Sequence, residues 1–279
     1  MPDYWLYELT PKRRLSAIAA NGPRRGALIR VNGGFADVHP WPELGDLPLD
    51  EQLALLARGE TTPLTEASLE FAGIDAAARR DGRSLFDKLT IPPSHWPGPD
   101  PPPGFDTVKL KGIDRIPDHV RLRIDFNATL TPEEFVQIAA TLPRERIDFI
   151  EDPCVFDPEV WRELREQTGL RLALDRAASS CPADSYDVLI LKPAIQEMTC
   201  SDVEIVVTSY MDHPIGQLCA AYTAATANIT STCGLITHVL YQNDAFIERM
   251  RIDGTRLVPP GGTGWGFDDL LENLPWRTL

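Results

Sequence analysis

Three carboxylates stand where short apolar segments end: Asp125 in LRIDF, Glu151 in FIEDP and Asp175 in LALD. Lysines hold similar places in the flanking segments, with Lys109 and Lys111 in VKLKG and Lys192 in LILKP. Carboxylates brought close together repel one another and are costly to desolvate, so a hard divalent cation has to neutralise them. The pattern therefore predicts a metal site flanked by basic groups, and Mg2+ is the expected ion.

The spacing of these residues predicts that they share one rim of a barrel. Roughly one strand-plus-helix unit separates each carboxylate from the next. Side chains alternate along a strand, so Lys109 and Lys111 share one face, as do Asp125 and Asn127. Active sites of parallel barrels lie at the carboxyl ends of the strands, where all these residues fall. We expect Asn127 one layer further out, where it can bind metal-bound water or substrate.

The segments that carry these residues belong to a repeating pattern of short strands from Ser84 onward. Eight apolar strands are predicted, at residues 84–91, 107–113, 120–127, 147–153, 170–175, 187–193, 204–210 and 233–237. Amphipathic helices are predicted after only three of them, at residues 131–142, 157–169 and 214–228. The connection 92–106 is too rich in proline for a helix, and 114–119 is too short. The fold class is therefore α/β, a modified (β/α) TIM-type barrel with reduced outer helices.

The N-terminal part predicts a small α+β capping domain. Strand alternation and helical periodicity predict two strand regions and two helices, at residues 4–9, 26–38, 50–59 and 65–82. We expect three segments in the domain organisation: a capping domain at 1–85, a barrel at 86–257, and a tail at 258–279 that returns to complete the cap.

Composition narrows the class of partner. The net charge of −14 and the pI of about 4.8 argue against a general nucleic-acid binder, which needs a basic face to displace counterions. The N-terminus lacks the pattern of a signal peptide, so a cytoplasmic protein without membrane contact is expected. The five cysteines follow neither a disulfide nor a zinc pattern. We expect a small-molecule carboxylate substrate, and nothing in the sequence predicts an oligomeric state.

This set of residues resembles the enolase superfamily and, within it, the muconate-lactonising subgroup that contains the o-succinylbenzoate synthases. The motifs that carry the resemblance are K-x-K at 109–111, D-x-N at 125–127, E-D-P at 151–153, Asp175, and L-K-P at 191–193. It covers most of the chain, starting at the G-x-A-D-V-H-P segment. Lysines on both sides of the metal site distinguish this subgroup from relatives that use histidine, and the five histidines here form no dyad pattern.

The resemblance implies that a proton is removed from the carbon next to a substrate carboxylate. The expected metal ligands are Asp125, Glu151 and Asp175, which would hold Mg2+ or, in its place, Mn2+. The ion would bind the substrate carboxylate and stabilise negative charge on its oxygens. Lys111 would be the base and would then protonate the departing hydroxyl. Lys192 would stabilise the intermediate from the opposite side.

The implied reaction is that of a carbon-oxygen lyase. It is the dehydration of 2-succinyl-6-hydroxy-2,4-cyclohexadiene-1-carboxylate to 2-succinylbenzoate, a step of menaquinone biosynthesis. Lys109, Asn127 and Ser209 are the expected substrate-binding residues, and Lys109 would also tune Lys111. The loop 13–25, which is rich in arginine, is expected to close over a dianionic substrate.

Three other functions use the same residues. An N-acylamino acid racemase or dipeptide epimerase would employ Lys111 and Lys192 as opposed acid and base. A Schiff-base aldolase would use a lysine without a metal. A barrel that has lost its activity would serve as a binding or scaffold protein.

Overall fold

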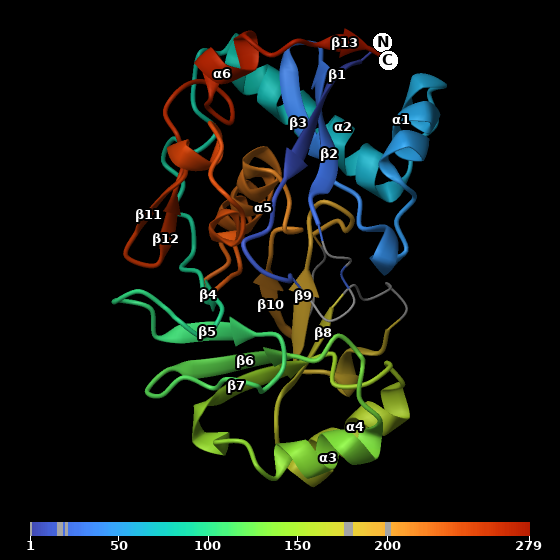
Figure 1. Cartoon of the computed structure of the whole chain (residues 1–279), viewed down its shortest axis with the longest axis vertical. Coiled ribbons are helices and arrows are strands. Elements are labelled where there is room, and N and C mark those ends of the chain that lie inside the picture. Colours follow the sequence, from blue (N-terminus) through green and yellow to red (C-terminus); the bar gives the residue numbers. More distant parts are fainter. Residues whose placement is uncertain (1, 16–18, 20–21, 176–180, 199–201) are drawn as a thin grey trace.

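The N-terminal part of the chain forms an antiparallel sheet covered by two helices (Figure 1). The computed structural model describes residues 2–15, 19, 22–175, 181–198 and 202–279. The strands, in sheet order, are β13 (Arg277–Thr278), β1 (Asp3–Leu9), β2 (Arg24–Val31) and β3 (Gly34–Val38). The helices are α1 (Leu49–Ala57) and α2 (Pro63–Arg80). Both predicted strand regions and both predicted helices are confirmed, and the tail pairs with β1. The boundary at residue 85 stays a prediction.

Helix α2 packs very closely on strand β3. Its start follows from the sequence, since Thr62 accepts a hydrogen bond from the backbone of Thr65 and proline occupies the first turn. A Cβ atom added to Gly34 would lie 1.9 Å from the carbonyl oxygen of Ala72 and 2.5 Å from the backbone nitrogen of Ala76. Only glycine leaves room for the backbone of α2 at this point.

Substitution of Gly34 by alanine is expected to destabilise the fold by about 1 to 3 kcal/mol, because the added methyl group meets backbone that cannot move aside. The matched control is Gly73→Ala in α2, where an added Cβ meets nothing within 4 Å. That change should stabilise the protein by up to about 1 kcal/mol through helix propensity. Urea unfolding of both variants checks the prediction, and equal effects of the two substitutions would contradict it.

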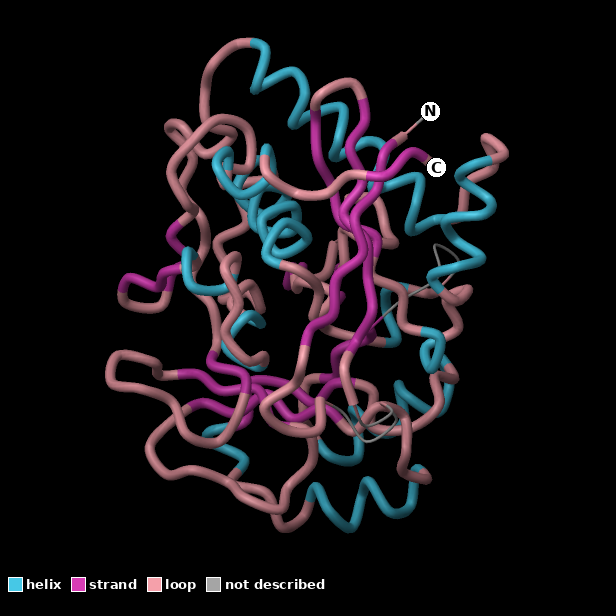
Figure 2. The backbone as a smooth tube through the Cα atoms, turned by 45° about the horizontal axis from the view of Figure 1, so that its top comes forward, coloured by secondary structure: helices cyan, strands magenta, loops and turns pink. Residues whose placement is uncertain are grey.

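The rest of the chain builds a parallel sheet that curls into a barrel (Figures 1 and 2). Its strands are β4 (Trp96–Pro97), β5 (Thr107–Leu110), β6 (Arg121–Asp125), β7 (Ile147–Glu151), β8 (Leu172–Asp175), β9 (Val188–Leu191) and β10 (Glu204–Val207), each next to its successor. Two single bridges close the barrel: Gly234 pairs with Thr208 after β10, and Cys233 pairs with Ser94 before β4. The barrel predicted from the sequence is therefore present.

The first predicted barrel strand is wrong. Residues 85–88 form a turn, and only Ser84 makes a bridge, to Gly264. Leu85 and Ile91 are nonetheless buried, so the apolar pattern reflected packing at the junction with the cap. The true first strand is β4, inside the segment predicted as a proline-rich connection. A parallel strand of two residues demands so few backbone donors that it accommodates Pro97.

The outer layer of the barrel is sparse. The helices α3 (Pro132–Ala139), α4 (Pro158–Thr168) and α5 (Pro214–Thr226) match the three predicted ones. The connections 98–106 and 111–120 contain no helix, as predicted. In Figure 1, α3 and α4 lie beneath the strands β6 and β7, whereas α5 lies between the N-terminal sheet and β10. One core fills the space between the sheet and α3 and α4, and a small separate core fills the barrel.

The remaining elements complete the junction between cap and barrel. They are the hairpin β11 (Arg251–Asp253) and β12 (Arg256–Val258), and the short helix α6 (Asp268–Glu272). Among the described residues, no helix combines the length and the apolar character needed to cross a bilayer. The described cysteines, Cys154, Cys181, Cys219 and Cys233, are free thiols.

Two buried acids meet where the cap rests on the barrel. Asp37 accepts hydrogen bonds from the hydroxyl of Tyr7 at 2.5 Å and from the backbone of His213 at 3.0 Å. Asp212 follows β10, and its Oδ2 lies on the same side of Gly216 as Oδ2 of Asp37. Burial raises the pKa of Asp212 to about 7 and raises that of Asp37 as well. Asp37 thus ties the segment after β10 to the cap, through the backbone of His213.

The stability of the protein should fall between pH 4 and pH 7 because of Asp212. Its pKa rises from 3.8 to about 7 on folding, so the folded state binds a proton that the unfolded state has lost in this range. The Asp212→Asn variant lacks this term. The free energy of unfolding of this variant, relative to that of the wild type, should rise by up to about 4 kcal/mol between pH 4 and pH 7. Above pH 7 the difference should stay constant. Urea unfolding measured at several pH values checks this, and a constant difference would contradict it.

Candidate active site

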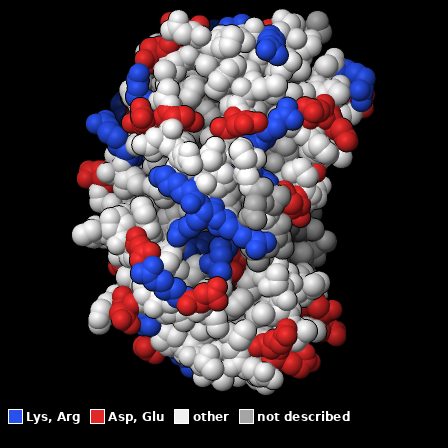
Figure 3. Space-filling model, in the orientation of Figure 1, with Lys and Arg blue, Asp and Glu red and all other residues white. Residues whose placement is uncertain are grey.

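A cavity of about 350 Å³ opens at the carboxyl ends of the barrel strands. Six of the eight predicted site residues line it: Lys109, Lys111, Asn127, Asp175, Lys192 and Ser209. Asp125 and Glu151 are almost completely buried beneath the lysines. Figure 3 shows lysine and arginine side chains gathered over a hollow in the middle of this face. The structure thus brings all eight predicted residues into one site.

The register of the strands aligns the three carboxylates. Asp125 on β6 is paired with Glu151 on β7, which in turn is paired with Ala173 on β8. Asp175 lies two residues beyond Ala173, on the same face of β8. Neighbouring residues of a parallel sheet point to the same side, so all three carboxylates face the interior of the barrel.

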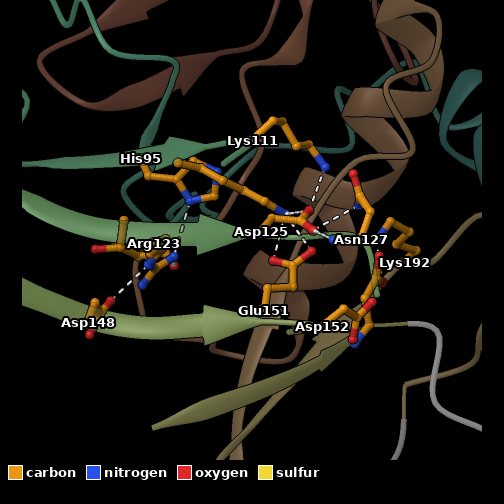
Figure 4. A network of polar contacts seen from close by, with 12 residues as sticks. His95, Lys111, Arg123, Asp125, Asn127, Asp148, Glu151, Asp152 and Lys192 are labelled. Carbon is orange, nitrogen blue, oxygen red and sulfur yellow. Dashed lines mark hydrogen bonds and ion pairs between the residues drawn. The ribbon is translucent and has the colours of Figure 1, made fainter. Parts of the chain in front are cut away.

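Lysine ammonium groups compensate these carboxylates. Nζ of Lys109 lies 2.6 Å from Glu151 and 3.2 Å from Asp125. Nζ of Lys111 lies 2.5 Å from Asp125, and Lys192 forms an ion pair with Asp175. In sheet order, β5 and β9 flank the three strands of the carboxylates, so Lys111 and Lys192 approach from two sides (Figure 4).

The charges of this cluster shift one another's pKa values. Burial lowers the pKa of Lys109, but the charges of Glu151 and Asp125 outweigh it, so this pKa lies above its usual range. Burial and the charge of Asp125 raise the pKa of Glu151 to about 7. Burial also acts to raise the pKa of Asp125, yet Lys111 and Lys109 hold it well below its usual range. Adjacent carboxylates compete for the same positive charge, which favours ionisation of Asp125 over that of Glu151.

The donor set suits a hard divalent cation. The loop after β6 turns through Asn127 with φ of 51°, and both the backbone nitrogen and Nδ2 of this residue donate to Asp125 at 2.8 Å. Oδ1 of Asn127 is buried, and no hydrogen-bond partner for it exists among the described residues. Three carboxylates and a spare amide oxygen are the ligands that Mg2+ prefers. In the described parts of the chain, no three acidic, histidine or cysteine side chains already surround one metal position.

Ser209 lies in the cavity wall just beyond β10. Its hydroxyl is 2.6 Å from that of Thr237, and its backbone nitrogen donates to the carbonyl of Gly234 at 3.0 Å. The side chain is therefore held in place on the side of the barrel away from the carboxylates, where a substrate can reach it.

The sequence analysis missed two features of the site. Asp152, from the same E-D-P motif as Glu151, lines the cavity and accepts a hydrogen bond from the backbone of Asp175 at 3.1 Å. Burial and the charge of Asp175 raise the pKa of Asp152 well above the usual range. His95 and Arg123 also enter the barrel, at 3.1 Å from one another. Arg123 precedes Asp125 by two residues, so strand alternation alone could have indicated it.

The arginine-rich loop is only partly described, since residues 16–18, 20 and 21 lie outside the described residues. Arg13 and Arg14 line the cavity, and Arg13 donates to the carbonyl of Pro97. The loop therefore adds positive charge to the cavity. Its closure over a substrate stays a prediction.

Comparisons with known proteins agree with this geometry. The family described as "O-succinylbenzoate synthase, N-terminal domain" matches residues 2–78, and "Enolase C-terminal domain-like" matches residues 103–192. An o-succinylbenzoate synthase of Bdellovibrio bacteriovorus is 35% identical over 99% of this chain and 98% of the relative. A second o-succinylbenzoate synthase, of Mycolicibacterium smegmatis, is 27% identical over 50% of this chain and 48% of the relative.

Solved structures share the fold at lower identity. The L-Ala-D/L-Glu epimerase from Bacillus subtilis superposes with a TM-score of 0.76 at 15% identity, over 95% of this chain and 97% of the other. A dipeptide epimerase from Enterococcus faecalis, solved with Mg and the dipeptide L-Leu-L-Tyr, gives a TM-score of 0.75 at 15% identity, over 95% and 98%. At this level of identity the likeness concerns the architecture of cap and barrel.

Proposed function

The chain belongs to the o-succinylbenzoate synthase family of the enolase superfamily, and from this premise we propose that it dehydrates 2-succinyl-6-hydroxy-2,4-cyclohexadiene-1-carboxylate to 2-succinylbenzoate. The observation that carries the proposal is the pair Lys111 and Lys192 on either side of three carboxylates, of which Asp125 and Glu151 are buried. The enzyme would thus be a carbon-oxygen lyase that supplies menaquinone biosynthesis.

Asp125, Glu151 and Asp175 would hold Mg2+, and the spare oxygen of Asn127 supports this assignment. The bound ion would supply positive charge that stabilises the negative charge developing on the substrate carboxylate. Lys109 takes part by sharing its charge between Asp125 and Glu151, which lowers the repulsion between the two ligands.

Lys111 carries the proton in this proposal. Its neutral amine takes the proton from the carbon next to the substrate carboxylate. The electron pair left behind then forms the ring double bond as the carbon-oxygen bond to the hydroxyl breaks. The resulting ammonium gives this proton to the departing hydroxyl, which leaves as water. A single lysine on one face of the substrate thus carries out both proton transfers. Its side chain is 30% exposed toward the cavity, which gives it access to substrate.

Lys192 acts from the opposite face. Its backbone nitrogen is held by the side chain of Gln196 at 3.0 Å, and its side chain is buried. A buried ammonium fixed in this way is suited to stabilising negative charge through the reaction without giving up its proton.

The test is a direct comparison of two reactions with the purified protein and Mg2+. Dehydration of the cyclohexadiene substrate is followed by formation of the aromatic product. Exchange of the α-proton of dipeptides and N-acylamino acids is followed in deuterated water. We expect dehydration to be the faster reaction by far. Proton exchange without dehydration would overturn the proposal in favour of a racemase or epimerase, to which the same two lysines are suited.

A further inference from the structure

His95 lies inside the barrel next to the site, and the mechanism above does not use it. Its backbone nitrogen donates to the carbonyl of Cys233 at 2.9 Å, which anchors it where the barrel closes. In the register of β4 and β5, Pro97 is paired with Lys109, so His95 shares the inward face with that lysine. The residue is 4% exposed and belongs to the lining of the cavity.

The contact with Arg123 determines which ring nitrogen of His95 carries the hydrogen. Nδ1 lies 3.1 Å from Nη1 of Arg123. A guanidinium group can only donate, so Nδ1 accepts and the hydrogen of the neutral ring is on Nε2. Burial, together with the charge of Arg123, lowers the pKa of His95 well below its usual value, so the ring stays neutral.

Arg123 is itself held rigidly, so it is a reliable partner for His95. Its Nε donates to Asp148 at 2.8 Å, and its Nη1 also donates to the carbonyl of Thr232 at 2.6 Å. Its guanidinium lies 4.6 Å from the ring centre of Phe149. The register between β6 and β7 shifts at this point, so Asp148 on β7 has no paired residue on β6. As the extra residue of this irregularity, it can reach Arg123.

The other edge of the ring faces the cavity. A Cβ atom on Gly234 would lie 3.1 Å from Nε2 of His95 and 2.9 Å from a methyl carbon of Thr208, so the glycine leaves this edge open. Among the residues that the structure describes, the ring of His95 makes its hydrogen bond through Nδ1 to Arg123, and Nε2 makes none. The hydroxyl of Thr208, on the other side of Gly234, is likewise without a partner in the described chain. Two polar groups here are thus left for something other than protein.

We propose that Nε2 of His95 donates a hydrogen bond to an oxygen of the succinyl arm of the substrate. Nδ1 of the ring points to Arg123 on β6, whereas Nε2 lies against Gly234, where the barrel closes between β10 and β4. This closure is on the opposite side of the barrel from β7, so Nε2 faces away from the carboxylates that would bind the ring carboxylate. The arm is the part of the substrate that extends away from that end and carries acceptor oxygens. The inference rests on the proposed function and names a specificity residue for it.

Two substitutions separate this role from a structural one. His95→Asn keeps an acceptor near the position of Nδ1 for Arg123 and removes the donor at Nε2. His95→Gln places an amide nitrogen near the position of Nε2 and gives up the acceptor. We expect His95→Asn to weaken the affinity for 2-succinylbenzoate by about tenfold, with unchanged urea unfolding, and His95→Gln to restore most of that affinity. Wild-type affinity for 2-succinylbenzoate in His95→Asn, together with weakened affinity in His95→Gln, would overturn the proposal.

Benzoate, which lacks the arm, serves as the matched ligand. Its affinity should be equal in the wild type and in His95→Asn, and an equal loss for both ligands would overturn the assignment to the arm. Nitrogen-15 NMR of the wild type should show a hydrogen on Nε2 that shifts when 2-succinylbenzoate binds. Binding without this shift would overturn the role of His95 alone. Absence of both dehydration and 2-succinylbenzoate binding in the wild type would instead overturn the proposed function, and the proposal with it.

Discussion

Replacement of Lys111 by alanine is expected to lower kcat for dehydration by about three orders of magnitude. The lysine is assigned both proton transfers, and a positioned acid-base group contributes about two to four orders of magnitude to a rate. The fold should tolerate the change, because the side chain is partly exposed and Asp125 keeps its contact with Lys109 at 3.2 Å. Steady-state kinetics, together with the affinity for 2-succinylbenzoate and urea unfolding, measures the effect.

Two further variants define the cause of the loss. Lys111→Arg keeps the positive charge but cannot lose a proton, so it should be nearly as inactive as the alanine variant. Lys88 is exposed and has a φ of 64°, which asparagine tolerates, so Lys88→Asn is a matched removal of an ammonium group far from the chemistry. It should retain full activity. Substantial activity in Lys111→Arg would show that the residue acts through its charge, and an active Lys111→Ala would contradict its role altogether.

Removal of divalent metal with EDTA is expected to abolish dehydration, and Mg2+ or Mn2+ should restore it. The protein should remain folded without the ion, because Lys109 and Lys192 already compensate the three carboxylates. Added Mg2+ should raise the melting temperature, and the rise should grow with the logarithm of its concentration above the Kd. Activity that persists in EDTA and is trapped by borohydride would contradict the metal mechanism and indicate a Schiff base.

The metal position is tested by substitution of one ligand. Glu151→Gln should weaken Mg2+ binding by at least tenfold in calorimetric titration, since a neutral amide replaces a charged ligand. Glu145→Gln is the control, because this glutamate precedes the same strand but is exposed. It should bind Mg2+ as the wild type does. Equal affinity in both variants would place the ion elsewhere.

Much of the barrel was predictable because its pattern is local. Apolar segments that end in a charged residue predicted the five strands from β5 to β9, and the apolar segment 204–210 predicted β10. A proline-rich connection and a very short one predicted where outer helices are missing. The first strand was not predictable, since β4 has only two residues and the apolar segment before it is buried in a turn. The eighth strand was predicted at residues 233–237, but only Cys233 and Gly234 form bridges, so its place was predicted and its length was not.

By itself, the sequence determined the chemistry available to this protein, namely three carboxylates and three lysines at strand ends. Their order along the chain places them on consecutive strands. Periodicity and spacing carry this information, because parallel strands bring their carboxyl ends to one rim. Only the tertiary structure decided which groups pair, as with Lys109 between Asp125 and Glu151. It also decided that His95 meets Arg123, through a register shift and a barrel closure that join residues distant in the chain. Such contacts depend on the packing of the whole barrel, which no local pattern records.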